Sequence, residues 1–211
     1  MATVLILPEQ TVVLRAVSWE TYENLLSDHL NVSAPRFTFD RGVLEIMSPS
    51  SEHEEDNRTL ALVVEVLAEE LGMDIRDLGS TTFKRADLQR GFEADSCFYI
   101  QTAGRISLRS HVDPAVDPPP DLVIEVDLSG TALSKFPVYS HFGVPEIWRY
   151  DGNRVGIFKL VGREYVQSEA SSAFPAVHGA DLSHFLQQAK CLKRTGWLRM
   201  LRSWAREKRD G

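Results

Sequence analysis

Apolar and acidic residues alternate along residues 121–127, which read Asp-Leu-Val-Ile-Glu-Val-Asp. Side chains of a β-strand point to opposite faces in turn, so Asp121, Glu125 and Asp127 share one face and the apolar even positions form the other. A carboxylate in a buried strand costs free energy unless it is hydrogen-bonded, paired or bound to a metal. Asp95 occupies a second apolar, strand-like run upstream. Two such strands, each with an inward acid, indicate a divalent-cation site.

The N-terminal half of the chain contains clear signals for two helices. Ser18 is a suitable N-cap for a helix that runs to about Leu30, with apolar residues at helical spacing. Ser51 and Glu54 form a Ser-x-x-Glu capping box, which predicts the start of a long helix. We expect this second helix to stop at Gly72, since glycine is a natural helix terminator.

The remaining patterns predict strands and further helices. Turn residues at 40–42 and at 151–153 each lie between apolar runs, so both segments are predicted to form hairpins. The other expected elements are strands near 73–77, 81–85, 93–100 and 163–167, a helix over 131–142 that ends at Gly143, and two C-terminal helices. This order of elements predicts an α/β fold with a mixed sheet.

Length and composition are those of an ordinary globular protein. At 211 residues we expect one domain over 1–211, with 181–211 as a basic helical extension. No apolar run approaches the about 20 residues of a membrane helix, and the N-terminus lacks the pattern of a signal peptide. Cys97 and Cys191 lack the spacing of a metal or redox pair, which is typical of a reducing compartment. We therefore expect a cytoplasmic protein.

The charge of the chain is unevenly distributed. A formal net charge of −7 argues against a surface that is basic throughout for gripping nucleic acid. Residues 190–211 nevertheless contain eight basic and two acidic residues. A basic tail on an acidic body can contact phosphates or dock on an acidic partner subunit. It can equally be a solvated helix face, which is the interpretation we favour, because cations near a helix end suit the helix dipole.

Several motifs of the chain occur together in the order found in one family. They are Gly42 to Pro49 followed by His53, Gly91 to Asp95, Pro119 to Ser129, and Tyr139 to Trp148. With these motifs, which lie within residues 18–165, the chain resembles the Uma-type family of predicted endonucleases, a former domain of unknown function that is abundant in cyanobacteria. That family belongs to the restriction-endonuclease-like, or PD-(D/E)XK, superfamily.

The resemblance implies a mixed central β-sheet flanked by helices, and an endonuclease that hydrolyses phosphodiester bonds in DNA with Mg²⁺, for which Mn²⁺ could substitute. Asp95 matches the first aspartate of the superfamily pattern, and Glu125 matches the acid of its (D/E)XK element. Both would bind the metal, with the backbone carbonyl of Val126 as a further ligand. The metal would lower the pKa of a bound water and stabilise charge on the scissile phosphate. By analogy with restriction-like nucleases, which cut two strands with two sites, a homodimer is a possible assembly.

Two positions depart from the superfamily pattern. Ala94 replaces the proline of the literal PD pair, which leaves the aspartate in place. Asp127 replaces the lysine that would orient the attacking water, and so reverses a charge. Asp127 could be a third metal ligand or could hydrogen-bond Ser129 and the turn. Lys135, in the helix that follows, is the obvious substitute for the missing lysine; if it faces water instead, the chain would be a catalytically degenerate nuclease-fold protein with a binding or assembly role.

Four other acids or histidines have both structural and functional interpretations. Asp121 completes a literal Pro-Asp pair, but it shares a strand with Glu125, so we expect it to cap the start of that strand. His53 could contact a phosphate or the metal, or could be structural at the start of its helix. Glu45, on a hairpin strand, and Glu65, in mid-helix among valines, are possible accessory acids, and Glu65 is expected to be more than a surface residue.

Other chemistries lack their sequence signals. The chain contains no Gly-x-Ser-x-Gly, no His-Glu-x-x-His and no phosphate-binding glycine loop. Cys97 shares a strand with Asp95, but no partner histidine is indicated by spacing. The hairpin aromatics, such as Trp148, are better explained by core packing than by base stacking. A DNA-binding module that rests on the basic tail alone is the remaining alternative.

Overall fold

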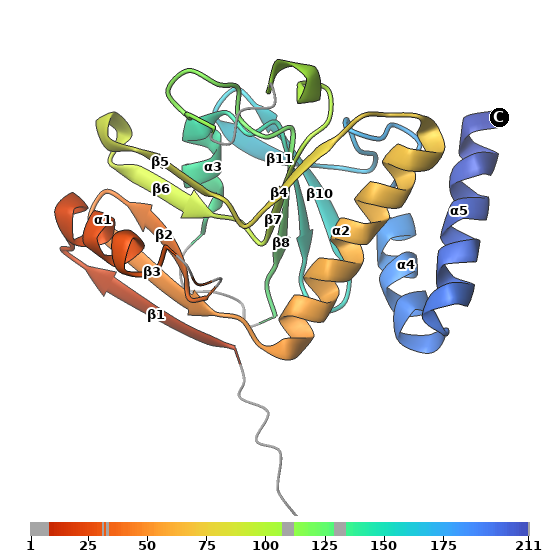
Figure 1. The fold of residues 1–211 in the computed structure, drawn as a ribbon, viewed down its shortest axis with the longest axis horizontal. Coiled ribbons are helices and arrows are strands. Elements are labelled where there is room, and N and C mark those ends of the chain that lie inside the picture. Colours follow the sequence, from red (N-terminus) through yellow and green to blue (C-terminus); the bar gives the residue numbers. More distant parts are fainter. Residues whose placement is uncertain (1–8, 31, 33, 107–111, 129–133, 211) are drawn as a thin grey trace, which may run out of the picture.

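Two β-sheets form the centre of the protein (Figure 1). The computed structural model describes residues 9–30, 32, 34–106, 112–128 and 134–210. Sheet A contains five strands in the order β1-β3-β2-β6-β5, and sheet B contains six in the order β11-β10-β9-β8-β7-β4. The strands are β1 Gln10–Arg15, β2 Arg36–Asp40, β3 Val43–Ser48, β4 Arg76–Gly79, β5 Thr82–Arg85, β6 Arg90–Glu93, β7 Ser96–Tyr99, β8 Leu122–Val126, β9 Glu146–Tyr150, β10 Val155–Val161 and β11 Glu164–Ser168.

Helices pack against both of these sheets. Within the described ranges they are α1 Trp19–Asp28, α2 Ser51–Leu71, α3 Phe136–Phe142, α4 Gly179–Cys191 and α5 Arg194–Asp210, with two short 3-10 helices, η1 Ala86–Leu88 and η2 Ala103–Arg105. Helices α2 and α4 pack against one face of sheet B and α5 packs against these two helices, whereas α1 lies against sheet A (Figure 1). None of the helices in the described part of the chain has the length and apolar character needed to span a membrane.

Sheet B is the mixed sheet expected from the sequence. Strand β8 runs parallel to β9 and antiparallel to β7. The side chains of β8 alternate as predicted: Leu122 and Ile124 belong to the core cluster under α2, whereas Val123 belongs to a second cluster with Tyr139 of α3. Glu125, two positions after Val123, therefore shares the face of sheet B that looks toward α3.

The chain passes from sheet A to sheet B at Asp95. The sequence predicts one strand over 93–100, but β6 ends at Glu93 in sheet A and β7 begins at Ser96 in sheet B. Asn57 of α2 fixes this crossing, because its Nδ2 donates to the Asp95 carbonyl at 3.1 Å and its Oδ1 accepts from Ser96 Oγ at 2.9 Å. The first candidate acid is thus anchored at the joint between the two sheets.

The start of helix α2 differs by one residue from the prediction. Its N-cap is Ser50, whose side chain accepts a hydrogen bond from the His53 backbone N–H at 3.1 Å. The predicted capping box of Ser51 and Glu54 is wrong, since the Glu54 carboxylate forms an ion pair with an arginine of β2 instead. The predicted end of the helix is confirmed, with Gly72 in the left-handed conformation (φ 67°).

Helix α3 begins later than the predicted helix over 131–142. The first three of those positions lie outside the described residues, and Lys135 is the N-cap residue, with Pro137 in the first turn. Proline has no amide N–H and its fixed φ suits the first turn, so this is a favourable place for a helix to start. The helix ends at Gly143 (φ 79°), as predicted.

The other predicted elements are present, although the strand expected near 73–77 begins only at Arg76 and runs to Gly79 as β4. Ser18 caps α1 by accepting from the Thr21 N–H at 3.1 Å. The hairpin between β2 and β3 turns at Arg41 and Gly42, which both have positive φ. The hairpin of β9 and β10, the following strand β11 and the two C-terminal helices also form as expected.

The basic C-terminal segment packs against α2 and binds acids of that helix. Arg202 Nη1 and Arg206 Nε each donate to the Glu70 carboxylate at 2.7 Å. Lys190 Nζ lies 2.9 Å from Asp56 Oδ1. These contacts neutralise part of the positive charge of the segment within the chain itself.

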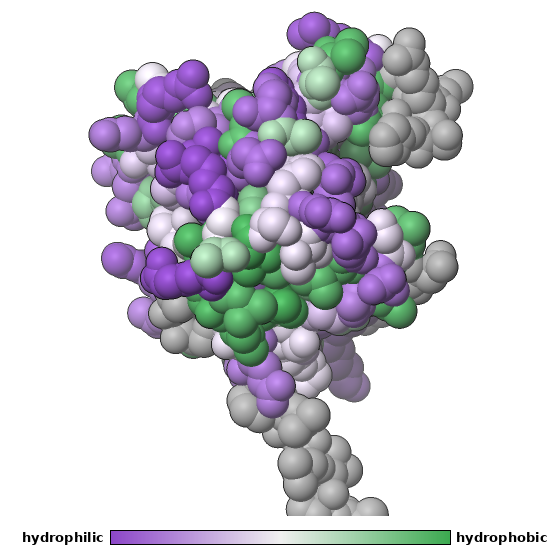
Figure 2. Space-filling model, turned by 90° about the vertical axis from the view of Figure 1, so that its left-hand side faces the viewer, coloured by the Kyte–Doolittle hydropathy of each residue, from purple (hydrophilic) through white to green (hydrophobic). Residues whose placement is uncertain are grey.

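The side of the molecule that carries sheet A shows a hydrophobic area among hydrophilic residues (Figure 2). Strand β1 is the outermost strand of sheet A, and its Val12 and Leu14 side chains are exposed. Leu14 lies opposite Leu44 of β3, which belongs to the core cluster beneath α1. The apolar face that α1 covers thus continues to the uncovered edge of the sheet.

Candidate active site

Asp95 is a buried carboxylate with partners from three elements. Its Oδ1 forms an ion pair with Arg36 of β2 and lies 2.9 Å from His53 Nε2 of α2. Its Oδ2 accepts a hydrogen bond from the Val126 N–H of β8 at 2.7 Å. Burial alone would raise the pKa of Asp95, but the His53 hydrogen bond and the Arg36 charge lower it below its ordinary value. Asp95 is therefore held ionised, beside the strand that carries Glu125.

Glu125 is the centre of a second set of contacts. Its Oε2 lies 2.8 Å from Lys135 Nζ, and its Oε1 accepts from the Tyr139 hydroxyl. Lys135 Nζ is also 4.0 Å from Glu45 Oε1. Burial raises the pKa of Glu125, with the Asp95 charge adding to the effect and Lys135 opposing it. Burial alone would lower the pKa of Lys135, but the surrounding carboxylates raise it, so this side chain remains an ammonium ion.

His53 links Asp95 to a further carboxylate. Its Nδ1 lies 2.5 Å from Glu9 Oε2, and its Nε2 faces Asp95. Burial alone would lower the pKa of His53, but the hydrogen bonds to these two acids raise it to about 9. At neutral pH the imidazole therefore carries a positive charge, and both ring N–H groups donate. Arg36 extends the same network by pairing with Glu54 as well as Asp95.

The two networks together hold more negative than positive charge. Among the ion pairs of the described residues, five carboxylates share three cationic groups, with His53 counted as charged; they are Glu9, Glu45, Glu54, Asp95 and Glu125 against Arg36, His53 and Lys135. A divalent cation would neutralise the excess, and the carboxylate oxygens of Asp95 and Glu125 are hard ligands that suit Mg²⁺. Because Mg²⁺ commonly takes only one or two protein carboxylates and completes its shell with water, the residues present fit this ion.

Asp127 is not part of a ready three-carboxylate centre. Its Oδ2 forms an ion pair with Arg149 Nη2 of β9. Within the described ranges, no three histidine, cysteine or acidic side chains converge closely enough to hold a metal ion. The expected set of Asp95, Glu125 and Asp127 as metal ligands stays a prediction, and the third acid pairs with an arginine here. Its other expected partner, Ser129, lies outside the described residues.

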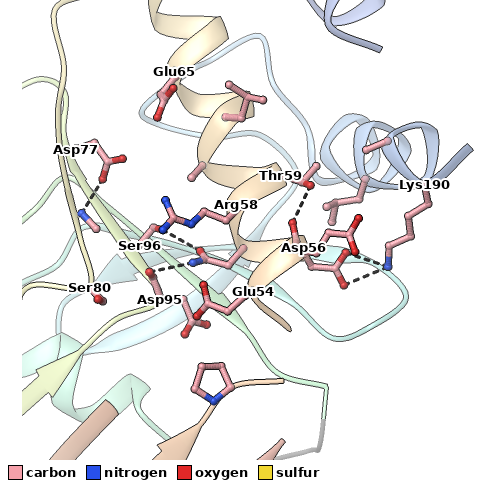
Figure 3. Close-up of a pocket in the computed structure, with 18 of the residues that line it drawn as sticks. Glu54, Asp56, Arg58, Thr59, Glu65, Asp77, Ser80, Asp95, Ser96 and Lys190 are labelled. Atoms are coloured by element: carbon pink, nitrogen blue, oxygen red, sulfur yellow. Dashed lines mark hydrogen bonds and ion pairs between the residues drawn. The ribbon is translucent and has the colours of Figure 1, made fainter. Parts of the chain in front are cut away.

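The remaining sequence candidates lie apart from Glu125. Asp121 Oδ2 accepts from the backbone N–H groups of Ile100 and Thr102 at 2.7 and 2.9 Å, so it caps the start of β8 as expected. Glu65 is exposed on α2, further along the helix than Glu54 (Figure 3). Glu65 is exposed while its neighbouring valines face the core, but it lines a cleft along α2 that also reaches Asp95, so its accessory role stays a prediction.

Two openings border the site. A cleft of about 860 Å³ runs along α2 and is lined by Asp95, Arg58 and Glu54, among others (Figure 3). A smaller hollow of about 240 Å³ is lined by Glu125 and Lys135. The side chain of Asp95 has no exposed area, whereas those of Glu125 and Lys135 are 8% and 10% exposed. The smaller hollow is therefore the direct approach to the second acid and the lysine.

Sequence reasoning did not identify Arg36, Tyr139 and Glu9 as contacts of the candidate acids. Tyr139 stands within a recognised motif, and its position four residues after Lys135 on one helix face could have indicated that both reach the same partner. Arg36 and Glu9 carried no comparable signal, because their contacts with Asp95 and His53 arise only when distant segments come together.

A mixed sheet flanked by helices, with an acid from each of two neighbouring strand regions and a lysine beside them, is the architecture of restriction-endonuclease-like proteins. The chain belongs to the Uma2 family. Residues 19–190 match the model of this family, whose description is "Putative restriction endonuclease". The resemblance drawn from the sequence motifs is thereby confirmed.

The fold is shared with a solved relative. A crystal structure of "a putative nuclease belonging to DUF820" from Anabaena variabilis superposes with a TM-score of 0.54 at 15% sequence identity, covering 81% of this chain and 99% of that chain. A comparison with curated proteins gave no match. At this identity the structural likeness shows the fold alone, and the restriction-endonuclease-like prediction is confirmed. Family and fold together support a nuclease role.

Proposed function

We propose that the protein is a Mg²⁺-dependent endonuclease that hydrolyses phosphodiester bonds in DNA. The observation that carries the proposal is the approach of two buried acids from neighbouring strand regions, Asp95 and Glu125, with the Lys135 ammonium 2.8 Å from the second acid. Restriction-endonuclease-like proteins generally use divalent metals, and the excess of carboxylates around these residues suits such an ion.

Asp95 and Glu125 would hold the metal, with the Val126 carbonyl as a further oxygen ligand. When bound, Mg²⁺ supplies a water of lowered pKa and stabilises negative charge on the phosphate. Asp95 is prepared for this role because Arg36 and His53 keep it ionised despite its burial. These two residues are positioning residues, since they act through Asp95.

Lys135 acts as a fixed positive charge. The carboxylates around it raise its pKa, so it cannot serve as a general base near neutral pH. An ammonium group at this place would instead orient the attacking water and offset charge on the scissile phosphate. Lys135 stands at the start of α3, and Tyr139 of the same helix binds the other oxygen of Glu125. The two contacts together hold the start of α3 against this carboxylate.

The test is conversion of supercoiled plasmid DNA to nicked and linear forms with Mg²⁺ or Mn²⁺. Asp95→Asn, Glu125→Gln and Lys135→Met should each reduce cleavage by at least about a hundredfold. Glu164→Gln is the matched control, because it removes one exposed acid that lines neither opening of the site. Cleavage that survives both acid substitutions in proteins with unchanged circular dichroism would refute the assignment.

A second candidate is a nuclease-fold protein that binds or assembles without cleaving. The observation in its favour is that Asp95 and Glu125 already have cationic partners, Arg36, His53 and Lys135. Calorimetric titration with Mn²⁺ separates the two candidates. Binding that Asp95→Asn abolishes supports the nuclease, whereas absence of binding together with absence of cleavage supports the inactive protein.

A further inference from the structure

Arg149 stands beside the proposed metal ligands on the neighbouring strand. It lies directly opposite Glu125 in the parallel register of β8 and β9. Residues opposite one another on paired strands point to the same face of a sheet. Arg149 and Glu125 therefore share the face of sheet B that looks toward α3, although 24 positions separate them in the sequence.

Arg149 also opens into the hollow that leads to the site. It lines the cavity of about 240 Å³ together with Glu125, Lys135 and Asp127. Its side chain is 40% exposed, four times as much as that of Lys135 at 10%. Lys135 is thus a buried cation, and Arg149 is a second, accessible cation at the mouth of the same hollow.

Asp127 holds this arginine in place. The backbone N–H of Asp127 donates to the Tyr150 carbonyl at 2.8 Å, which ties the end of β8 to β9. From this fixed position its carboxylate pairs with Arg149 Nη2. Among the described residues Asp127 is the hydrogen-bond acceptor that the structure gives to Arg149, so a guanidinium with five N–H donors keeps others for a ligand.

We propose that Arg149 binds a backbone phosphate of the DNA at the mouth of the hollow, with Asp127 as its positioning partner. A guanidinium is suited to this task because its planar fork matches phosphate oxygens in a bidentate manner. Asp127, which replaces the expected lysine, then orients Arg149 toward the substrate. The inference rests on the proposed nuclease function and adds a substrate-binding residue to it.

Binding of a fluorescein-labelled DNA duplex, measured by fluorescence anisotropy in EDTA so that no cleavage occurs, tests the role of Arg149. Arg149→Ala should weaken binding about tenfold and reduce the slope of log affinity against log salt by about 0.9, as expected for one lost phosphate contact. Arg149→Lys should retain part of the affinity, since it keeps the charge but loses the fork. Arg154→Ala is the matched control, because it removes an exposed arginine of the same net charge outside this hollow.

Calorimetric Mn²⁺ titration tests the role of Asp127. Asp127→Asn should leave Mn²⁺ affinity within about twofold of the wild type, whereas Glu125→Gln should lower it at least about tenfold. If Arg149→Ala binds DNA as tightly as the wild type, or loses no more affinity than Arg154→Ala, the role of Arg149 is overturned and the proposed nuclease function stands. A loss of Mn²⁺ affinity in Asp127→Asn equal to that in Glu125→Gln would make Asp127 a metal ligand and overturn the inference as well. A wild-type protein that neither binds nor cleaves DNA would overturn the proposed function too.

Discussion

The hydroxyl of Tyr139 should stabilise the fold through Glu125, and Tyr139→Phe tests this directly. The substitution keeps the ring, which is fully buried in the cluster between sheet B and α3, and removes only the donor to Glu125 Oε1. A hydrogen bond to a charged group contributes about 1.5–3 kcal/mol, and Lys135 remains 2.8 Å from the other carboxylate oxygen. We therefore expect a loss of about 2 kcal/mol in the free energy of unfolding.

The chain offers a matched control for this measurement. Tyr165 donates its hydroxyl to the neutral backbone carbonyl of Val144 at 2.7 Å. Tyr165→Phe should cost about 1 kcal/mol, the usual contribution of a neutral hydrogen bond. Because 1 kcal/mol corresponds to about 2–4 °C in a chain of this size, the two variants should lower Tm by about 4–8 °C and about 2–4 °C respectively.

Urea unfolding followed by tryptophan fluorescence gives both free energies from one protocol. The slope against urea should be the same for the wild type and both variants, since neither changes the surface exposed on unfolding. A Tyr139→Phe protein as stable as the wild type, or less affected than Tyr165→Phe, would refute the reasoning that Glu125 is an ionised acceptor in the core.

Two further predictions concern the thiols and the acid stability of the C-terminal helices. Cys97 is buried, and burial raises the pKa of its thiol, whereas Cys191 is exposed. A thiol reagent should therefore label Cys191 rapidly and Cys97 only after guanidinium is added. Rapid labelling of both cysteines in the native protein would contradict the burial of Cys97. Hydrogen bonds from Arg206 and Arg202 lower the pKa of Glu70 from 4.5 to about 2, so its contribution to stability is complete above pH 4.5 and is lost as the pH falls toward 2. In circular dichroism, Glu70→Gln should lack the loss of stability between pH 4.5 and 2 that comes from Glu70. An unchanged acid transition in this variant would contradict the contribution of the Glu70 ion pairs.

The patterns that repeat along the chain were sufficient to predict most elements. The period of two in β8 placed Leu122 and Ile124 on one face and Glu125 on the other before any packing was known. Gly72 and Gly143 ended their helices because a left-handed terminal residue is a local property of glycine. Local chemistry decides such features, so a single sequence reveals them.

Features set by distant contacts could not be predicted in the same way. The run at 93–100 contains no glycine or proline, and nothing in it indicates that two different sheets divide it. Ser50 and Ser51 are equally good caps by composition; the choice depends on Glu54, which pairs with Arg36 rather than closing a capping box. In both cases the deciding partner lies in another element.

The candidate site was predicted in part for the same reason. Asp95, Glu125 and Lys135 were found from their types and order, and the structure brings them together. The partner of Asp127 was missed, because Arg149 comes from the strand beyond the next helix. Its role as a metal ligand was inferred from residue type alone, and residue type does not reveal which opposite charge is nearest.

The crossing at Asp95 makes the site depend on both sheets. Asp95 lies where the chain leaves sheet A, while Glu125 is built into sheet B. Because Ser96 follows Asp95 directly and pairs with Ile124 of β8, sheet B sets the spacing of the two acids, whereas Arg36 of sheet A sets the charge around Asp95. The hydrogen bond from the Val126 N–H to Asp95 contributes to this spacing. Contacts within sheet B thus align the two acids, and a contact from sheet A keeps one of them charged.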